Sequence, residues 1–132
     1  MNLVGVREPE IYGTRRMDDY VSELRAAMPE TEIVYRQSNH EGVLLDTLQE
    51  YGFGKAHGIV LNAAAYTHTS IALRDCVKAL TVPVAEVHLT DISRREEFRR
   101  TSYLTEVCAF TIAGHGQDGY RMAVEKLLKG EK

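Results

Sequence analysis

The sequence predicts an α/β fold in which a parallel sheet is covered by helices on both faces. The hydrophobic spacing switches repeatedly between the 3.6-residue period of an amphipathic helix and short apolar runs. These runs are nearly continuous, as strands are when both faces of a sheet are buried. Helices and runs also alternate along the whole chain, so each connection between strands is expected to be a right-handed crossover.

The first half of the chain contains two predicted helices and a strand between them. A helix over residues 17–28 is expected because apolar side chains recur at i, i+3, i+4 and i+7, with Thr14 as its cap. Residues 32–37 have the composition of a short strand. A second helix over residues 43–51 ends at Gly52, a residue typical of helix ends.

The second half continues the alternation. The expected elements are, in order, a strand over 58–61, a helix over 71–80, a strand over 82–88, a short exposed helix over 94–100, a strand over 107–113 and a helix over 118–129. Pro83 fits the start of its strand better than the middle, because proline cannot donate to the strand ladder.

Composition indicates one domain over residues 1–132 and excludes several classes. With 44% hydrophobic residues the chain can form a core without disulfides or metal. No apolar run approaches a membrane span, and the beginning of the chain lacks the pattern of a signal peptide. The net charge of −3 argues against a nucleic-acid partner.

The two cysteines, Cys76 and Cys108, each lie in an apolar context. Small thiols buried in a reduced cytoplasm are favoured over a structural disulfide. Neither cysteine has a CxxC partner or the spacing of a zinc site.

Ligands of such sheets bind beyond the carboxyl ends of the strands, which we call the carboxyl edge. The segments expected to follow the four strands are 38–40, 62–70, 88–90 and 114–116. They bring four of the five histidines, two asparagines and a turn rich in serine and threonine to this edge. The sequence therefore predicts a polar site there.

Two features at the carboxyl edge have both a functional and an ordinary interpretation. Alternation along the strand places Glu86 and His88 on one face, where a carboxylate orients an imidazole; a histidine paired only for structure is the alternative. The turn over 62–70 is suited to bind an anion at a helix N-terminus, or Thr69 or Ser70 simply caps that helix.

Two further segments carry arginines. Arg7 close to Tyr12 favours a phenolate, and an exposed tyrosine beside an exposed arginine is the alternative. The charged run over 94–100 is either a solvated helix face or a segment in which a buried Phe98 directs an arginine at an anion. All five lysines fall away from the carboxyl edge, which disfavours Schiff-base chemistry.

Six ordered motifs make the chain resemble the type II 3-dehydroquinate dehydratases over essentially all of its length. They lie at residues 7–13, 37–42, 66–70, 71–75, 86–89 and 95–99. The resemblance implies a flavodoxin-like three-layer sandwich. It also implies the anti elimination of water from 3-dehydroquinate, through an enolate and without cofactor or metal, in the shikimate or quinate pathway. A nucleotide-binding or phospho-receiver module of the same fold would need a phosphate loop or an acidic cluster, which the sequence lacks.

The resemblance also implies the role of individual residues. Tyr12 matches the general base, Arg7 the residue that activates it, and His88 the general acid, with Glu86 behind the histidine. The positions that match substrate-binding residues are Asn62, His68, Asp75, Leu89, Thr90 and Arg99. Among them, Asp75 matches a residue that reaches a neighbouring subunit, since the family forms a dodecamer of trimers, and a cytoplasmic location is expected.

Two departures from the family pattern matter. Thr90 and Asp91 stand where the family has serine and asparagine, so a negative charge is added near an anionic substrate. The chain also starts just after the point where family members have a central strand leading into a Gly-Pro-Asn turn. We therefore expect the true start to lie upstream; a truncated paralogue with impaired catalysis, acting as a structural or binding subunit, is the alternative.

Overall fold

The structure, a computed structural model, describes residues 16–92 and 96–130. The chain divides into two compact units, Met1–Asn39 and His40–Lys132. The expectation of one domain over the whole chain stays a prediction, and the two units are described in turn.

In the first unit, the helix α2 (Met17–Ala27) confirms the first predicted helix. Its buried side chains follow the expected helical spacing: Met17, Tyr20, Val21 and Leu24. The expected cap, Thr14, lies outside the described residues, and Arg16 occupies the N-cap position without a side-chain cap bond. The guanidinium of Arg25 donates to the carbonyl of Ile33 at 3.0 and 3.1 Å, which attaches the next segment to this helix.

The strand predicted over residues 32–37 does not form. The segment shows the period of two that an extended backbone produces: Ile33 and Tyr35 are half-buried and Val34 is 45% exposed. A strand also needs a hydrogen-bonded partner, and the sheet formed by the described residues pairs only other segments. Apolar pattern alone therefore predicted the extended backbone correctly and the strand wrongly.

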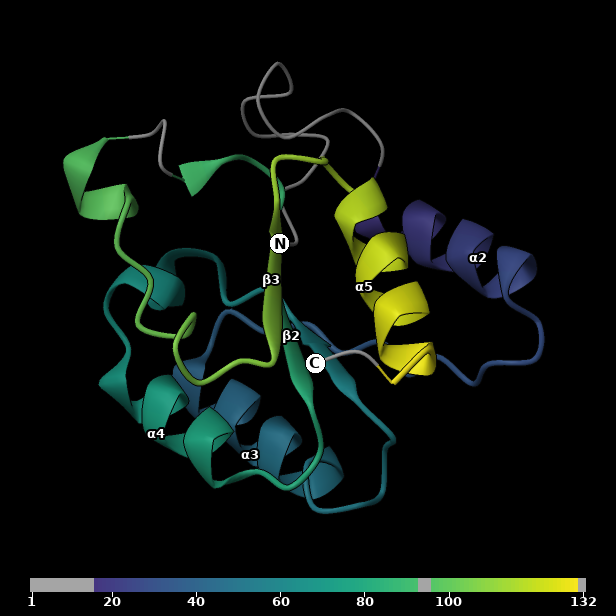
Figure 1. Ribbon diagram of the computed structural model, residues 1–132, viewed down its shortest axis with the longest axis horizontal. Helices are drawn as coiled ribbons and strands as arrows, with labels where there is room; N and C mark the ends of the chain where they lie inside the picture. The colour runs from purple at the N-terminus through teal and green to yellow at the C-terminus, as the bar shows by residue number, and fades with distance from the viewer. Residues whose placement is uncertain (1–15, 93–95, 131–132) are drawn as a thin grey trace. The chain divides into compact units, whose positions relative to one another are not determined.

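The second unit contains a parallel sheet of three strands in the order β1-β2-β3 (Figure 1). The strands are β1 (Ile59–Leu61), β2 (Val84–His88) and β3 (Phe110–Ala113). They confirm the last three predicted strands, although β3 starts later because residues 107 and 108 turn back to the Leu104 carbonyl. Every residue of the central strand β2 is buried, as its nearly continuous apolar run predicted.

Helices cover both faces of this sheet, which confirms the predicted flavodoxin-like, three-layer arrangement. The helices are α3 (Glu41–Tyr51), α4 (Ile71–Ala79) and α5 (Asp118–Leu128). Figure 1 shows α3 and α4 side by side on one face and α5 on the other. The core under α3 and α4 includes Leu48, Leu61, Leu73 and Val84, and the core under α5 includes Ala85, Val87, Ile112 and Ala123.

In two regions the described residues form only short 3₁₀ turns. The loop after β1 contains η1 (Ala64–His68), and the charged run contains η3 (Glu97–Arg99) in place of the expected exposed helix. Phe98 in η3 is 67% exposed. The suggestion that a buried Phe98 anchors this segment is therefore wrong, because an exposed ring gains nothing from the core.

Candidate active site

The centre of the candidate site is a buried pair of side chains on β2. Glu86 is 1% exposed and His88 is 6% exposed. Successive side chains on a strand point to opposite faces, so residues two positions apart share a face. Glu86 and His88 therefore both point to the face covered by α3 and α4. Their side chains meet with 2.6 Å between His88 Nε2 and Glu86 Oε2, which confirms the predicted pair.

Three hydroxyl groups complete the surroundings of the Glu86 carboxylate. Ser102 donates to Oε2, the same oxygen that contacts the histidine. Thr105 and Thr111 each donate to Oε1 at 2.7 Å. The carboxylate thus has two partners on each oxygen, which is close to its full capacity as an acceptor.

These contacts fix the charge of Glu86. Burial alone would raise the pKa of this carboxyl, but the hydrogen bonds from His88, Ser102, Thr105 and Thr111 outweigh it and lower the pKa to about 2. Glu86 is therefore ionised at neutral pH and only accepts hydrogen bonds. The ring proton of His88 consequently lies on Nε2, and Nδ1 is the nitrogen left to exchange a proton with a ligand.

The same shift predicts an acid-sensitive stability. A carboxyl whose folded-state pKa is about 2, against 4.5 in the unfolded chain, stabilises the fold fully above pH 4.5 and loses this contribution as the pH falls toward 2. The shift corresponds to about 3 kcal/mol. We expect wild-type protein to lose about this much more unfolding free energy between these pH values than Glu86→Gln, as measured by urea unfolding at a series of pH values. Parallel profiles for the two proteins would contradict the assignment.

Hydrogen bonds link the segment that carries Ser102 to the loop after β1. Nδ1 of His68 lies 2.7 Å from the carbonyl of Thr101, and the amide of Tyr103 donates to the carbonyl of Thr67. Arg74 on α4 donates to the Tyr103 carbonyl at 2.8 Å. The predicted residue His68 is thereby connected, through residues 101–103, to the hydroxyl that contacts Glu86.

Asn62 follows β1 directly and is held from two sides. Its Nδ2 donates to the hydroxyl of Tyr120 on α5 at 2.9 Å, and its Oδ1 accepts from the amide of Ala64 at 2.9 Å. Ala64 has a positive φ of 52°, a left-handed conformation that is uncommon for a residue with a Cβ. These two bonds orient the amide group and leave its second Nδ2 hydrogen for a ligand.

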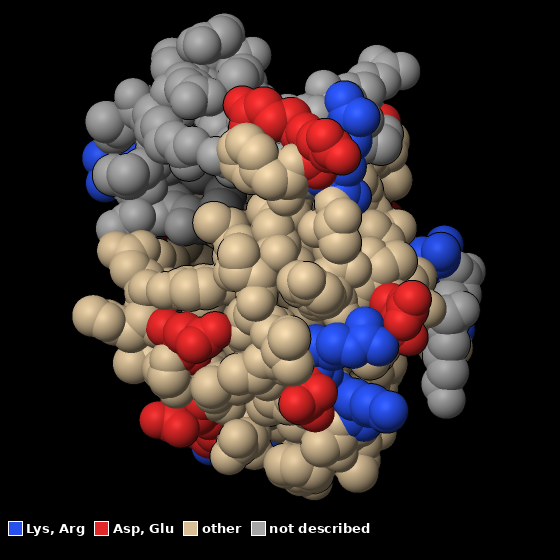
Figure 2. Space-filling model, turned by 90° about the vertical axis from the view of Figure 1, so that its left-hand side faces the viewer, with Lys and Arg blue, Asp and Glu red and all other residues tan. Residues whose placement is uncertain are grey.

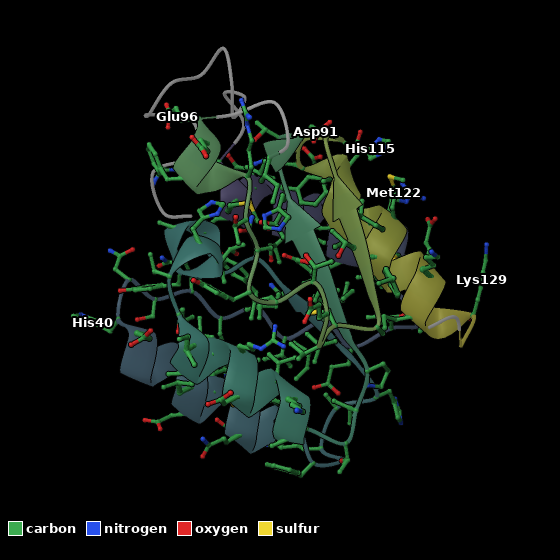
Figure 3. All side chains as sticks on the ribbon, turned by 60° about the vertical axis from the view of Figure 1, so that its left-hand side comes forward. His40, Asp91, Glu96, His115, Met122 and Lys129 are labelled. Carbon is green, nitrogen blue, oxygen red and sulfur yellow. The ribbon has the colours of Figure 1, made fainter. Side chains whose placement is uncertain are left out.

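The turn after β2 also lies at the carboxyl edge. Leu89 is buried, Thr90 is half-buried, and the amide of Gly116 donates to the Leu89 carbonyl at 2.9 Å. A side chain at Gly114, where φ is +83°, would approach Asp91 within 3.6 Å. Figure 3 shows Asp91 and His115 close to one another at this edge.

The structure places other predicted residues elsewhere. Figure 3 shows His40 well apart from Asp91 and His115, so this histidine does not join the cluster expected from strand order. Asp75 lies on the exposed face of α4. The side chain of Arg99 lies outside the described part, and Arg7 and Tyr12 lie outside the described residues.

Ser70 has the ordinary role that the sequence left open. Its hydroxyl accepts from the amide of Leu73 at 2.9 Å and so caps α4. The cap uses a lone pair of the Ser70 oxygen and satisfies one of the free amide groups at the start of α4.

Sequence reasoning missed Ser102, Thr105, Thr111 and Tyr120. Only Thr111 had a usable signal, because a polar residue within an apolar strand is unusual and its register places it opposite Glu86. The other three side chains reach the site through loop and helix packing, which local pattern does not encode.

Two kinds of feature are absent from the described residues. Within residues 16–92 and 96–130, no group of three or more His, Cys, Asp or Glu side chains is placed to hold a metal ion. Likewise, no helix in this part of the chain has the length and apolar character needed to cross a membrane.

Comparison with known proteins gives a consistent result. The family described as dehydroquinase class II matches residues 1–128. The chain is 44% identical over 131 residues to a 3-dehydroquinate dehydratase of Sulfurimonas denitrificans, covering 98% of this chain and 81% of that protein. Its identity to the enzyme of the same name from Pelodictyon phaeoclathratiforme is 48% over 129 residues, covering 97% and 85%.

A solved structure agrees with the sequence comparisons. The type II dehydroquinase of Butyrivibrio crossotus superposes with a TM-score of 0.92 at 38% identity, covering 96% of this chain and 90% of that one.

Proposed function

The chain belongs to the class II dehydroquinase family and is a 3-dehydroquinate dehydratase, and we propose that His88, held by Glu86, is its catalytic acid. The reaction removes water from 3-dehydroquinate and gives 3-dehydroshikimate, a step of the shikimate pathway. The observation that carries the proposal is the contact of 2.6 Å between the buried His88 ring and the ionised Glu86.

The first step of the proposed mechanism is proton removal from the carbon beside the ketone. Tyr12 takes this proton as a phenolate, and Arg7 stabilises the phenolate charge. The electron pair of the broken C–H bond moves onto the ketone oxygen and forms an enolate. Tyrosine needs such a cation because its unperturbed pKa of about 10 makes it mostly neutral at pH 7.

In the second step the enolate collapses and the C–O bond to the hydroxyl breaks. His88 acts here as an imidazolium, with one proton on Nε2 held by Glu86 and a second proton on Nδ1. It donates the Nδ1 proton to the departing oxygen, so that water leaves rather than hydroxide and a neutral ring remains. Glu86 holds the ring by Nε2 throughout, which keeps Nδ1 as the donor. The two steps together are redox-neutral, so the reaction needs no redox cofactor.

We assign substrate binding to the side chains at the carboxyl edge. Asn62 offers its remaining amide hydrogen, and His68 and Arg99 add polar and positive groups. The backbone amides of Leu89 and Thr90 are the carboxylate-binding turn. The exposed Asp91 beside this turn adds a negative charge, which weakens the binding of an anion slightly.

The stereochemistry of the elimination tests this mechanism. Substrate is prepared with deuterium beside the ketone, either on the face opposite the leaving hydroxyl or on the same face. Because base and acid are two separate residues, we expect anti elimination: deuterium on the opposite face is lost and deuterium on the same face stays in the product. The reverse pattern would contradict the roles given to Tyr12 and His88.

We also propose that the protein is a homo-oligomer, a dodecamer of trimers in which Asp75 reaches a neighbouring subunit's site. Val43 and Ile71, in the first turns of the neighbouring helices α3 and α4, are 47% and 59% exposed. On the face that Figure 2 shows, uncharged residues cover most of the surface. Exposed apolar groups of this kind favour association between copies.

Light scattering tests the assembly. Twelve copies of the 14.9 kDa chain would give a mass of about 179 kDa, and Ile71→Glu is expected to lower it because a buried charge disfavours the interface. Phe53→Glu is the matched control, since Phe53 is 57% exposed beyond the far end of α3. An active wild-type monomer at micromolar concentration would refute the proposal.

A cytoplasmic location completes the proposal. Cys76 and Cys108 are free, half-buried thiols. Burial raises the pKa of Cys76, and burial together with the charge of Glu86 raises the pKa of Cys108 to about 12. Protonated thiols without a disulfide are typical of a reducing compartment.

A further inference from the structure

The two oxygens of the Glu86 carboxylate have different partners. Oε2 receives the His88 ring and the Ser102 hydroxyl, whereas Oε1 receives only Thr105 and Thr111. The mechanism above uses Oε2 alone. The two threonine hydroxyls bound to Oε1 therefore have no role in the mechanism so far.

A terminal carboxylate is easily rotated, because the last torsion of a glutamate side chain is broad. A contact with His88 on one oxygen would leave this rotation free. Two further hydroxyl groups, donating to the other oxygen from different directions, hold the plane of the carboxylate in place. Oε2 then stays directed at Nε2 of the histidine.

The two threonines come from separate parts of the chain. Thr111 lies on β3, where its Cα is the register partner of Glu86 on β2. Thr105 lies on the irregular segment between η3 and β3. Both threonines are exposed to solvent, yet Glu86 beneath them is only 1% exposed. They therefore separate the carboxylate from water as well as bonding to it.

We propose that Thr105 and Thr111 are positioning residues, which act through Glu86 to hold His88 in the orientation that donates from Nδ1. The proposal rests on the function proposed above and adds two residues to its machinery. Neither threonine is placed to contact the substrate through its bonded hydroxyl, because that hydroxyl donates to Glu86.

Among the described residues, the ionisable groups that face Glu86 are His88, which bonds to it, and Cys108, whose pKa is raised in part by the charge of Glu86. Without the two hydroxyl groups, the carboxylate loses half of its hydrogen bonds and retains its burial. Protonation of Glu86 then begins at a higher pH, and a protonated Glu86 no longer fixes the His88 tautomer.

The test is the double variant Thr105→Val/Thr111→Val, which removes both hydroxyl groups and keeps the side-chain shape. We expect kcat to fall about 10- to 100-fold with KM within about 2-fold, and the acid limb of the kcat profile to move up by about one pH unit or more. Thr105→Ser/Thr111→Ser keeps both hydroxyl groups and should restore kcat and the profile.

Thr47→Val is the matched control. Its hydroxyl donates to the Val43 carbonyl within α3, remote from the carboxylate, so its loss should leave the profile unchanged. If the double variant does not fold, each single Thr→Val variant still removes one of the two hydrogen bonds. Each should then move the acid limb of the kcat profile to higher pH by a smaller amount.

A carbon-13 NMR titration of the Glu86 carboxyl group tests the role of the two threonines independently of the proposed dehydratase activity. Its midpoint should rise in the valine variants and stay low in the serine variants, whether or not 3-dehydroquinate is converted. An unchanged midpoint with an unchanged acid limb would overturn the proposal. Equal loss of kcat in valine and serine variants would also overturn it, because that result indicates a merely structural role.

Discussion

Replacing His88 by alanine is expected to lower kcat for dehydration by about 10²- to 10⁴-fold, the usual contribution of a positioned general acid. Loss of the hydroxyl then has no proton donor. Removal of the proton beside the ketone depends on Tyr12 and should continue. Substrate in D₂O should therefore still exchange this proton at a rate within about 10-fold of wild type, which is followed by proton NMR.

The control for this variant is His57→Ala, which removes an exposed histidine in the loop before β1. This loop lies at the end of β1 opposite to the carboxyl edge. This variant should retain wild-type kcat. If the exchange and the dehydration of His88→Ala fell by the same factor, the division of labour between Tyr12 and His88 would be wrong.

Replacing Tyr12 by phenylalanine should have the larger effect, a loss of both dehydration and proton exchange by about 10³-fold or more. Phenylalanine keeps the ring and cannot accept a proton, so the enolate does not form. Arg7→Ala should act in the same direction, because without the cation the Tyr12 hydroxyl stays protonated at neutral pH. Stopped-flow and NMR exchange assays on the same samples measure both rates.

Tyr51→Phe is the matched control, since it removes a hydroxyl from a tyrosine at the end of α3. It should leave both rates unchanged. Retention of proton exchange in Tyr12→Phe would contradict the role of Tyr12 as the base. The rates of dehydration and exchange in Tyr12→Phe and His88→Ala together identify which of the two steps each residue serves.

The central pair of the site was predictable from local pattern. Two residues in alternating positions of a strand share a face whatever the rest of the fold, so Glu86 and His88 had to be neighbours. The same holds for the helices α3, α4 and α5, whose apolar spacing depends only on the helical period.

The failures concern contacts between distant segments. Residues 32–37 have strand composition, but strand formation depends on a partner that composition does not supply. Ser102 and Thr105 reach Glu86 because residues 101–103 are fastened to the loop after β1, a long-range arrangement. Phe98 shows the same limit: the charged run left open whether this ring is buried or the segment is solvated, and the ring is exposed.

The most direct test of the account is the conversion of 3-dehydroquinate by the purified chain. Elimination creates a double bond conjugated with the ketone, so the product absorbs ultraviolet light that the substrate does not. We predict a steady rise in this absorbance with wild-type protein and a rise at least about 100-fold slower with His88→Ala at equal concentration. A folded wild-type protein that produced no such rise, or a His88→Ala variant that matched wild type, would contradict the account.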